Sequence, residues 1–192
     1  MSRYDLVVFD WDGTLVDSTG VIADSIRLAA ADLGLAVPTV EQASHVIGLG
    51  LADALRLTVP DLPHERLPAY IERYRVRYLE RQSHLAPFAG IGELLRDLAA
   101  EQPWLAIATG KSRVGLNHSL GRTDWAGHFV TTRCADEGAP KPDPWMLRDI
   151  CAELGVVPAR AVMIGDTTHD LAMARAAGAD CLAVTYGAHA EP

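Results

Sequence analysis

The first strand and the first loop of the chain read Leu6-Val7-Val8-Phe9-Asp10-Trp11-Asp12-Gly13-Thr14. Residues 6–9 are apolar without interruption, which is typical of a strand that helices cover on both faces of a parallel sheet. Ligands bind to such sheets where the strands end, so a functional site is expected in the loop that begins at Asp10.

Three further segments repeat this apolar pattern, and helical patterns lie between them. The strand-like segments are residues 104–108, 161–164 and 181–184, with a shorter one at 129–131. The helical patterns cover residues 91–100, 114–120, 144–154 and 171–177. Because strand and helix alternate, the sequence predicts right-handed βαβ units and an α/β fold built on a doubly wound parallel sheet.

An inserted helical unit is expected at residues 17–84, where the alternation stops. Ser18 or Thr19 is expected to cap one helix and Thr39 a second, and residues 60–63 form a proline-rich break. The predicted organisation is therefore a core of residues 1–16 and 85–192 that carries this insertion.

Tyrosines and arginines alternate along residues 64–82. The tyrosines have the spacing of a packed helical face, and we interpret the arginines as a solvated face, one of which is a candidate to bind a substrate anion. The residues concerned are Tyr70, Tyr74 and Tyr78, and Arg66, Arg73 and Arg77.

The composition limits the classes of function. The 192 residues carry a net charge of -8, which disfavours broad nucleic-acid binding because the background field repels phosphate polyanions. No segment reaches the roughly 18 apolar residues of a membrane span, and no secretory signal precedes Asp10. The three cysteines are widely spaced and odd in number, which indicates reduced thiols and not a disulfide framework. A cytoplasmic location is therefore expected. The oligomeric state, and whether Pro192 is a natural end, stay open.

Two pairs of acids follow strand-like segments. Asp10 and Asp12 follow the first strand, and Asp166 and Asp170 follow residues 161–164. If both strands are central neighbours, four carboxylates meet at one edge of the sheet, where oxygen ligands suit Mg²⁺. The alternatives are that these acids are solvated turn residues and that Asp170 caps the following helix, which it could do in either case.

Only two lysines occur in the chain, and both lie where an anion-binding site would need a positive charge. Lys141 is held between prolines directly before a helix, a position from which it can reach a phosphate. Lys111 follows Thr109 and Gly110 at the end of a strand, where a hydroxyl and free backbone N–H groups can bind an anion. A solvated loop lysine is the competing interpretation for Lys141.

These residues, in this order, resemble the four motifs of the haloacid dehalogenase superfamily of phosphotransferases. The motifs are residues 10–14, Thr109, Lys141 and residues 165–170. The resemblance covers nearly the whole chain and implies a Rossmann-like core. The insertion resembles the C1-type helical cap of the phosphoglycolate phosphatase-like branch, and Gly48 and Gly50 resemble a cap loop that faces the site.

The resemblance implies a role for each motif residue. Asp10 would be the nucleophile that forms an aspartyl phosphate, and Asp12 the general acid and base. Thr109, the backbone N–H of Gly110 and Lys141 would bind the phosphoryl oxygens.

The same resemblance implies Mg²⁺ as the cofactor. Its ligands would be the carboxylates of Asp10 and Asp166 and the backbone carbonyl of Asp12, with Asp170 as a ligand or a residue behind the ligands. The activity implied is that of a phosphoric monoester hydrolase, and the partner is a small phosphorylated metabolite, phosphoglycolate-like or a sugar phosphate.

Other branches of the superfamily fit less well. A dehalogenase lacks the second acid of the first motif, which Asp12 supplies here. A phosphonoacetaldehyde hydrolase needs a cap lysine, and residues 17–84 contain none. A phosphosugar mutase of the same fold stays open, as does a non-catalytic binding module, although no motif residue is missing.

Overall fold

The computed structural model describes residues 3–101 and 103–189. Five parallel strands form the central sheet in the order β5-β4-β1-β6-β7. The strands are β1 (Leu6–Phe9), β4 (Trp104–Thr109), β5 (Thr131–Cys134), β6 (Ala161–Gly165) and β7 (Asp180–Ala183). The order reverses direction at β1, so the predicted doubly wound α/β fold is confirmed.

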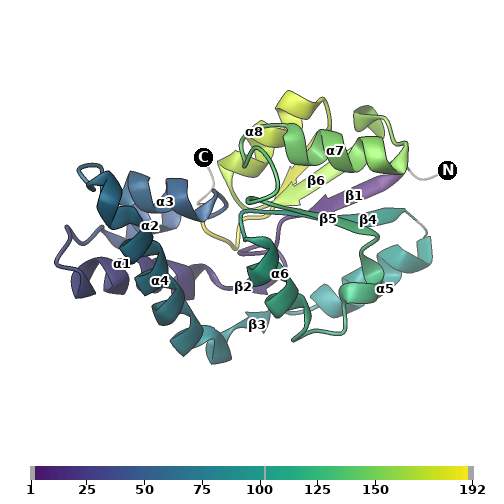
Figure 1. Cartoon of the computed structure of the whole chain (residues 1–192). Helices are drawn as coiled ribbons and strands as arrows, with labels where there is room; N and C mark the ends of the chain where they lie inside the picture. The colour runs from purple at the N-terminus through teal and green to yellow at the C-terminus, as the bar shows by residue number, and fades with distance from the viewer. Residues whose placement is uncertain (1–2, 102, 190–192) are drawn as a thin grey trace.

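Helices cover both faces of this sheet (Figure 1). One face carries α7 (Trp145–Leu154) and α8 (Thr168–Ala177), and the opposite face carries α5 (Ile91–Glu101) and α6 (Arg113–Leu120). Short 3₁₀ turns at Ala126–His128 and Pro158–Arg160 precede β5 and β6.

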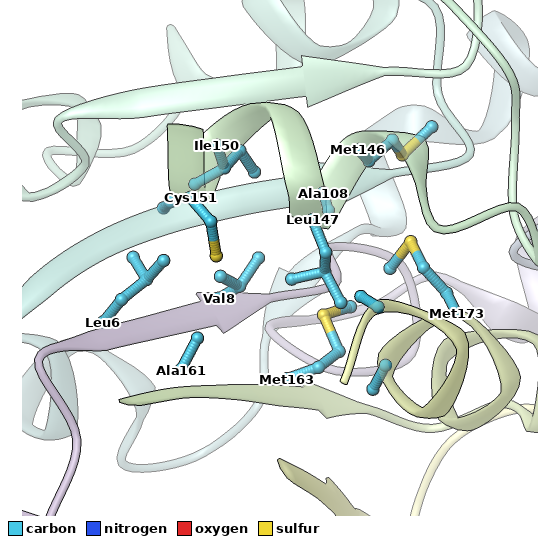
Figure 2. Close-up of a cluster of buried hydrophobic side chains, with 13 residues drawn as sticks. Leu6, Val8, Ala108, Met146, Leu147, Ile150, Cys151, Ala161, Met163 and Met173 are labelled. Atoms are coloured by element: carbon cyan, nitrogen blue, oxygen red, sulfur yellow. The ribbon is translucent and has the colours of Figure 1, made fainter. Parts of the chain in front are cut away.

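The central strand β1 explains why its sequence is apolar at every position. Leu6 and Val8 pack into the cluster beneath α7 and α8 (Figure 2). Val7 and Phe9 pack into the cluster on the opposite face. Successive side chains of a strand point to opposite faces, so a strand covered on both faces has no polar position.

The strand expected at residues 129–131 is shifted toward the carboxyl end. It begins at Thr131 and continues through Arg133, whose guanidinium pairs with Asp149 and Glu153 of α7. Because β5 lies at an edge of the sheet, its first three side chains are half-exposed and polar, and only Cys134 at its end is buried. The apolar residues that suggested the strand therefore lie directly before it, and one of them, Val130, is exposed.

The insertion forms a second helical layer beside the sheet (Figure 1). The chain leaves through β2 (Val16–Asp17) and returns through β3 (Ala86–Pro87), which pair antiparallel. Between them lie α1 (Thr19–Asp32), α2 (Val40–His45), α3 (Leu51–Thr58) and α4 (Leu67–Arg81), with 3₁₀ turns at His64–Arg66 and Gln82–His84. We call α1–α4 the cap. It has its own buried cluster, to which Ile26, Leu55 and Tyr70 belong.

Two of the expected helix caps have different outcomes. Thr39 forms a capping box with Gln42 at the start of α2, as predicted. Ser18 occupies the N-cap position of α1 but makes no capping hydrogen bond; its hydroxyl donates to Asp12 at 2.7 Å. Among the described residues, no helix has both the length and the apolar character that crossing a membrane requires.

Candidate functional site

The site residues come from the carboxyl ends of three adjacent strands. β4, β1 and β6 lie side by side, and Phe9 is in register with Ile107 and Ile164. β1 ends at Phe9, β4 at Thr109 and β6 at Gly165, so Asp10, Thr109 and Asp166 lie at the same edge of the sheet. The parallel pairing thus brings together three segments separated by more than fifty residues each.

Asp10 is a buried acid at this edge of the sheet, and it differs from its neighbours in its lack of hydrogen-bond donors. Its residue is 1% exposed, and neither carboxylate oxygen accepts a hydrogen bond from the described part of the chain. Lys141 Nζ lies 2.8 Å from its Oδ1. Burial raises the pKa of Asp10 well above its usual value, and the negative charges of Asp170 and Asp166 add to this effect, while Lys141 opposes it.

Lys141 also binds Asp170, and the two are the most completely enclosed ion pair of the site. The ammonium lies 2.6 Å from Asp170 Oδ1, and neither side chain is exposed. Asp170 Oδ2 accepts hydrogen bonds from the backbone N–H and the hydroxyl of Thr167. Asp170 therefore takes part in the capping box of α8, as the sequence allowed, and it also pairs with Lys141, which the sequence did not predict.

Asp166 is held by contacts from both ends of the chain. Its Oδ1 accepts a hydrogen bond from the Thr14 hydroxyl at 3.0 Å, and its Oδ2 accepts one from the backbone N–H of Ala188 at 2.6 Å. Burial raises its pKa to about 6, partly opposed by these hydrogen bonds. Gly187 allows the close approach, because a Cβ there would lie 2.2 Å from Asp166 Oδ2.

These three acids fit a divalent cation. One carboxylate oxygen from each of Asp10, Asp166 and Asp170 lies within 4.8 Å of the others. In the described ranges, Lys141 is the cation in ion-pair contact with this group, so two negative charges are left without a counter-charge. Hard oxygen ligands, two uncompensated charges and the unbonded oxygens of Asp10 are the conditions under which Mg²⁺ binds.

Asp12 stands apart from this cluster. Its Oδ1 accepts a hydrogen bond from Ser18 at 2.7 Å and lies 3.0 Å from Lys111 Nζ. Its carboxylate is not one of the three that converge, so a contribution of Asp12 to metal binding would come from its backbone carbonyl, as the resemblance implies.

Thr109 and Gly110 end β4 between the core and the cap. Thr109 is fully buried, and its hydroxyl accepts a hydrogen bond from the backbone N–H of Lys111. A Cβ on Gly110 would lie 2.6 Å from the carbonyl oxygens of both Gly48 and Leu49. Only a glycine allows the cap loop to approach this strand end so closely.

The cap also reaches the α8 side of the site. Gly48 has φ +94°, and a Cβ there would lie 3.1 Å from the Thr167 hydroxyl. His169 Nε2 and His189 Nε2 lie 3.1 Å and 3.0 Å from the backbone carbonyl of His45. The cap therefore rests on both sides of the strand ends.

The cap arginines do not lie at the site as the sequence suggested. Arg66 donates to the carbonyl of Leu33, and Arg73 and Arg77 both donate to the carboxylate of Asp32. These bonds hold α4 against the end of α1. The sequence predicted either a solvated face or a substrate-binding arginine. The structure shows neither role for these three guanidinium groups, because each is bonded to another residue of the cap.

Sequence reasoning missed the polar residues that hold the acids. Thr14, Thr167 and Ser18 bond Asp166, Asp170 and Asp12, and Tyr78 bonds Lys111. Each of these residues stands in a motif loop, at a helix start or on a helical face, where a structural role is equally common. The sequence therefore gave no separate signal that their side chains hold the acids and Lys111. Tyr70 is a packing residue, as predicted, with its hydroxyl donating to the carbonyl of Ile26.

The fold and the site define a capped α/β protein with an acidic, lysine-bearing centre at the carboxyl edge of its sheet. The model of haloacid dehalogenase-like hydrolases matches residues 7–184, and the chain belongs to this family. The predicted family is thereby confirmed.

The comparisons also show which members the chain resembles. It is 34% identical to the tyrosine-protein kinase PtkA of Mycobacterium tuberculosis over 184 residues, which cover 95% of this chain but only 62% of PtkA. It is 30% identical to the phosphoglycolate phosphatase of Agrobacterium fabrum, covering 95% of this chain and 81% of that enzyme. A crystal structure described as a predicted phosphoglycolate phosphatase from Haemophilus somnus matches with a TM-score of 0.86 at 25% identity, over 97% of this chain and 88% of the other. The phosphoglycolate phosphatase-like branch expected from the motifs is therefore supported.

Proposed function

We propose that the protein is a Mg²⁺-dependent phosphatase that hydrolyses a small phosphomonoester through an aspartyl phosphate on Asp10. The observation that carries the proposal is Asp10 itself, a buried carboxylate that pairs with the buried Lys141 and accepts no hydrogen bond from a backbone N–H or hydroxyl group of the described residues. The similarity to phosphoglycolate phosphatases supports the same class of substrate.

Asp10 attacks the phosphorus atom, and the ester oxygen leaves. The carboxylate is oriented by the turn after β1, where its backbone N–H donates to the carbonyl of Ile164. Apart from the Lys141 ammonium, 2.8 Å from Oδ1, no donor of the described residues is bonded to the carboxylate, so an oxygen is available to form the new bond. Water then hydrolyses the aspartyl phosphate and restores Asp10.

Asp12 gives a proton to the leaving oxygen and later takes one from water. Ser18 and Lys111 hold its carboxylate away from the three-acid cluster. This separation lets one acid act as nucleophile while the other handles protons.

Thr109, the Gly110 backbone N–H and Lys141 neutralise the oxygens of the transferred phosphoryl group. Lys141 is ordered before the substrate arrives because Asp10 and Asp170 hold its ammonium. Such preorganised groups stabilise the transition state at little cost in reorganisation. Mg²⁺, held by Asp10, Asp166 and Asp170 with the Asp12 carbonyl, would neutralise further phosphoryl charge.

The cap acts as one unit in this proposal. We place its boundaries at residues 17–84 and the core at 1–16 and 85–192, with β2 and β3 as the connection. Closure over the strand ends would exclude water and select the leaving group. A cytoplasmic location is the matching expectation for an enzyme that acts on small phosphorylated metabolites.

The test is phosphate release from a panel of small phosphomonoesters, with Mg²⁺ or with excess chelator. We expect turnover that depends on Mg²⁺ and is lost in Asp10→Asn, which keeps the shape of the side chain but removes the nucleophile. Asp53→Asn, at an exposed acid of α3, is the matched control and should keep full activity.

Two outcomes would contradict the proposal. A phosphorylated isomer formed without net release of phosphate would identify a mutase. Transfer of phosphate from ATP to tyrosine, with no ester hydrolysis, would instead assign the kinase activity that the name of PtkA describes.

A further inference from the structure

After β7 the chain folds back over the metal-binding acids. We call residues 186–189 the strap. Its residues contact Asp166, the start of α8 and the cap. The function proposed above gives the strap no role, although its backbone bonds Asp166 directly.

Both hydrogen bonds to the carboxylate of Asp166 depend on the strap. Ala188 donates its backbone N–H to Asp166 Oδ2 at 2.6 Å. The other donor is the Thr14 hydroxyl, and the carbonyl of Thr14 accepts a hydrogen bond from the Tyr186 hydroxyl at 3.0 Å. The Tyr186 ring also packs on Phe88, with ring centroids 4.4 Å apart. The strap therefore supplies one donor to Asp166 and holds the residue that supplies the other.

The carboxylate of Asp166 fits between two glycines. A Cβ on Gly187 would overlap Asp166 Oδ2, and so would a Cβ on Gly13. A side chain at residue 187 would therefore push the strap away and separate the Ala188 N–H from its acceptor. Because a carboxylate has several lone pairs, both oxygens of Asp166 can bind a metal ion while they keep these donors.

His189 fixes the end of the strap. Its Nδ1 accepts a hydrogen bond at 3.0 Å from the backbone N–H of Thr168, the first residue of α8. An N–H group at this position has no partner within its own helix. Because Nδ1 is the acceptor, the neutral ring carries its proton on Nε2, which donates to the carbonyl of His45 at 3.0 Å.

The strap also packs against the cap. The His189 ring stacks on the His45 ring of α2, with centroids 4.9 Å apart and planes 10° from parallel. Ala188 packs against the buried cluster of the cap. The same four residues therefore contact a candidate metal ligand and the cap.

We propose that the strap positions Asp166 for the metal ion, and that His189 is the positioning residue that anchors the strap between α8 and the cap. This inference rests on the Mg²⁺ site of the proposed function. Groups that orient a metal ligand commonly change metal affinity by about 10- to 100-fold when they are removed. With the strap in place, Asp166 is oriented before the ion binds, so less conformational entropy is lost on binding.

The experiment measures Mg²⁺ binding to the full, substrate-free chain by isothermal titration calorimetry. His189→Ala removes both anchoring bonds, and we expect its Kd for Mg²⁺ to rise by roughly tenfold or more. His189→Asn keeps an acceptor in the place of Nδ1, so its Kd should return to within about threefold of the wild-type value. His64→Ala, at an exposed histidine of the 3₁₀ turn before α4, is the matched control and should bind Mg²⁺ as the wild-type protein does.

Gly187→Ala tests the strap next to Asp166. The new Cβ would displace the Ala188 N–H, so the Kd should rise by about 10- to 100-fold. Gly127→Ala is its control, because a Cβ there meets nothing within 4 Å. In phosphate release, His189→Ala should need more Mg²⁺ for half of its maximal rate, while kcat at saturating Mg²⁺ stays within about threefold of the wild-type value.

An unchanged Kd in His189→Ala, or a rise that His189→Asn does not reverse, would overturn the inference. This holds even if His189→Ala unfolds at a lower denaturant concentration, because the strap would then be a structural contact only. A wild-type protein that binds no Mg²⁺ would overturn it as well. Failure of the proposed function has a different result: the wild-type protein would bind Mg²⁺ but release phosphate from no ester, and the order of the Kd values would still decide the role of the strap.

Discussion

The two lysines of this chain lie at one site but are held in different ways. Lys141 is enclosed by the core alone: its ammonium contacts Asp10 and Asp170, and its side chain has no exposed surface. Lys111 is shared, with Asp12 on the core side and Tyr78 on the cap side.

This difference separates two tasks. The group around Lys141 is built by strand ends and by the start of α8, so it is present whatever the cap does. The group around Lys111 requires α4. We therefore expect changes near Lys141 to affect the chemical step and the stability of the core, and changes near Lys111 to affect the choice of substrate.

Lys141→Met is the change with the largest expected effect. It leaves Asp10, Asp166 and Asp170 without their cation, and breaking a buried ion pair costs about 3–5 kcal/mol. Turnover should fall by roughly 100- to 1,000-fold, because a preorganised phosphoryl-binding group is lost. Denaturant unfolding and phosphate release measure the two effects.

The matched control is Lys111→Met. Asp12 keeps its hydrogen bond to Ser18, so the loss of unfolding free energy should be smaller, about 1–2 kcal/mol. Equal losses for the two variants would mean that the lysines are not held differently, and the comparison would be wrong.

Gly110→Ala tests the contact between the cap loop and β4. The new Cβ would lie 2.6 Å from two backbone oxygens, which cannot move aside as a side chain can. The cap loop would have to move away from β4, and the site would no longer close fully. We therefore expect kcat/KM to fall by roughly 10- to 100-fold while the core stays folded.

Gly20→Ala is the control for this variant, because a Cβ on Gly20 meets nothing within 4 Å. It should keep wild-type kinetics and be slightly more stable, since alanine is favoured over glycine in α1. Wild-type kinetics in Gly110→Ala would show that the cap does not close by this contact.

The acids around Lys141 also predict how Mg²⁺ and pH act together. Because the pKa of Asp166 is raised to about 6 and that of Asp10 is raised as well, both mainly by burial, the folded, metal-free protein holds protons that the unfolded chain has released. Its free energy of unfolding should fall as the pH rises from about 4 to about 6, by on the order of 3 kcal/mol for Asp166. Mg²⁺ should therefore stabilise the protein much more at about pH 8 than at about pH 5.

The histidines that contact the cap change the free energy of unfolding with pH in the opposite direction. Burial lowers the pKa values of His169 and His189, so their contribution to stability is lost as the pH falls below the ordinary histidine range. Comparing melting temperatures with and without Mg²⁺ at each pH separates the two effects. An equal gain from Mg²⁺ at both pH values would contradict a carboxylate metal site.

The core could be predicted from the sequence because its strands are apolar on both faces. The run at residues 6–9 and the acids after it indicated both the central strand and the edge of the sheet where the acids meet. The edge strand β5 was misplaced because half-exposed positions there tolerate threonine and arginine, so that its pattern is not apolar.

The cap side of the site could not be predicted in the same way. Tyr78 has the helical spacing of a packing residue, and Ser18 stands where a helix cap is expected. Their contacts with Lys111 and Asp12 depend on how the cap rests on the core, which periodicity does not encode. The scarcity of lysine was the one signal that pointed to residue 111.

The smallest effect is expected from Arg77→Ala, on the side of α4 that faces α1. Arg77 and Arg73 share Asp32, and hydrogen bonds from the two guanidinium groups hold the pKa of that carboxyl far below its usual range. All three side chains are partly exposed, so solvent screens the pairs and the melting temperature should change by no more than about 2 °C. Phosphate release from acidic and neutral phosphomonoesters should not change, because the guanidinium of Arg77 is bonded to Asp32 inside the cap. A clear loss of activity on acidic esters alone would show that Arg77 binds the substrate, as the sequence had allowed.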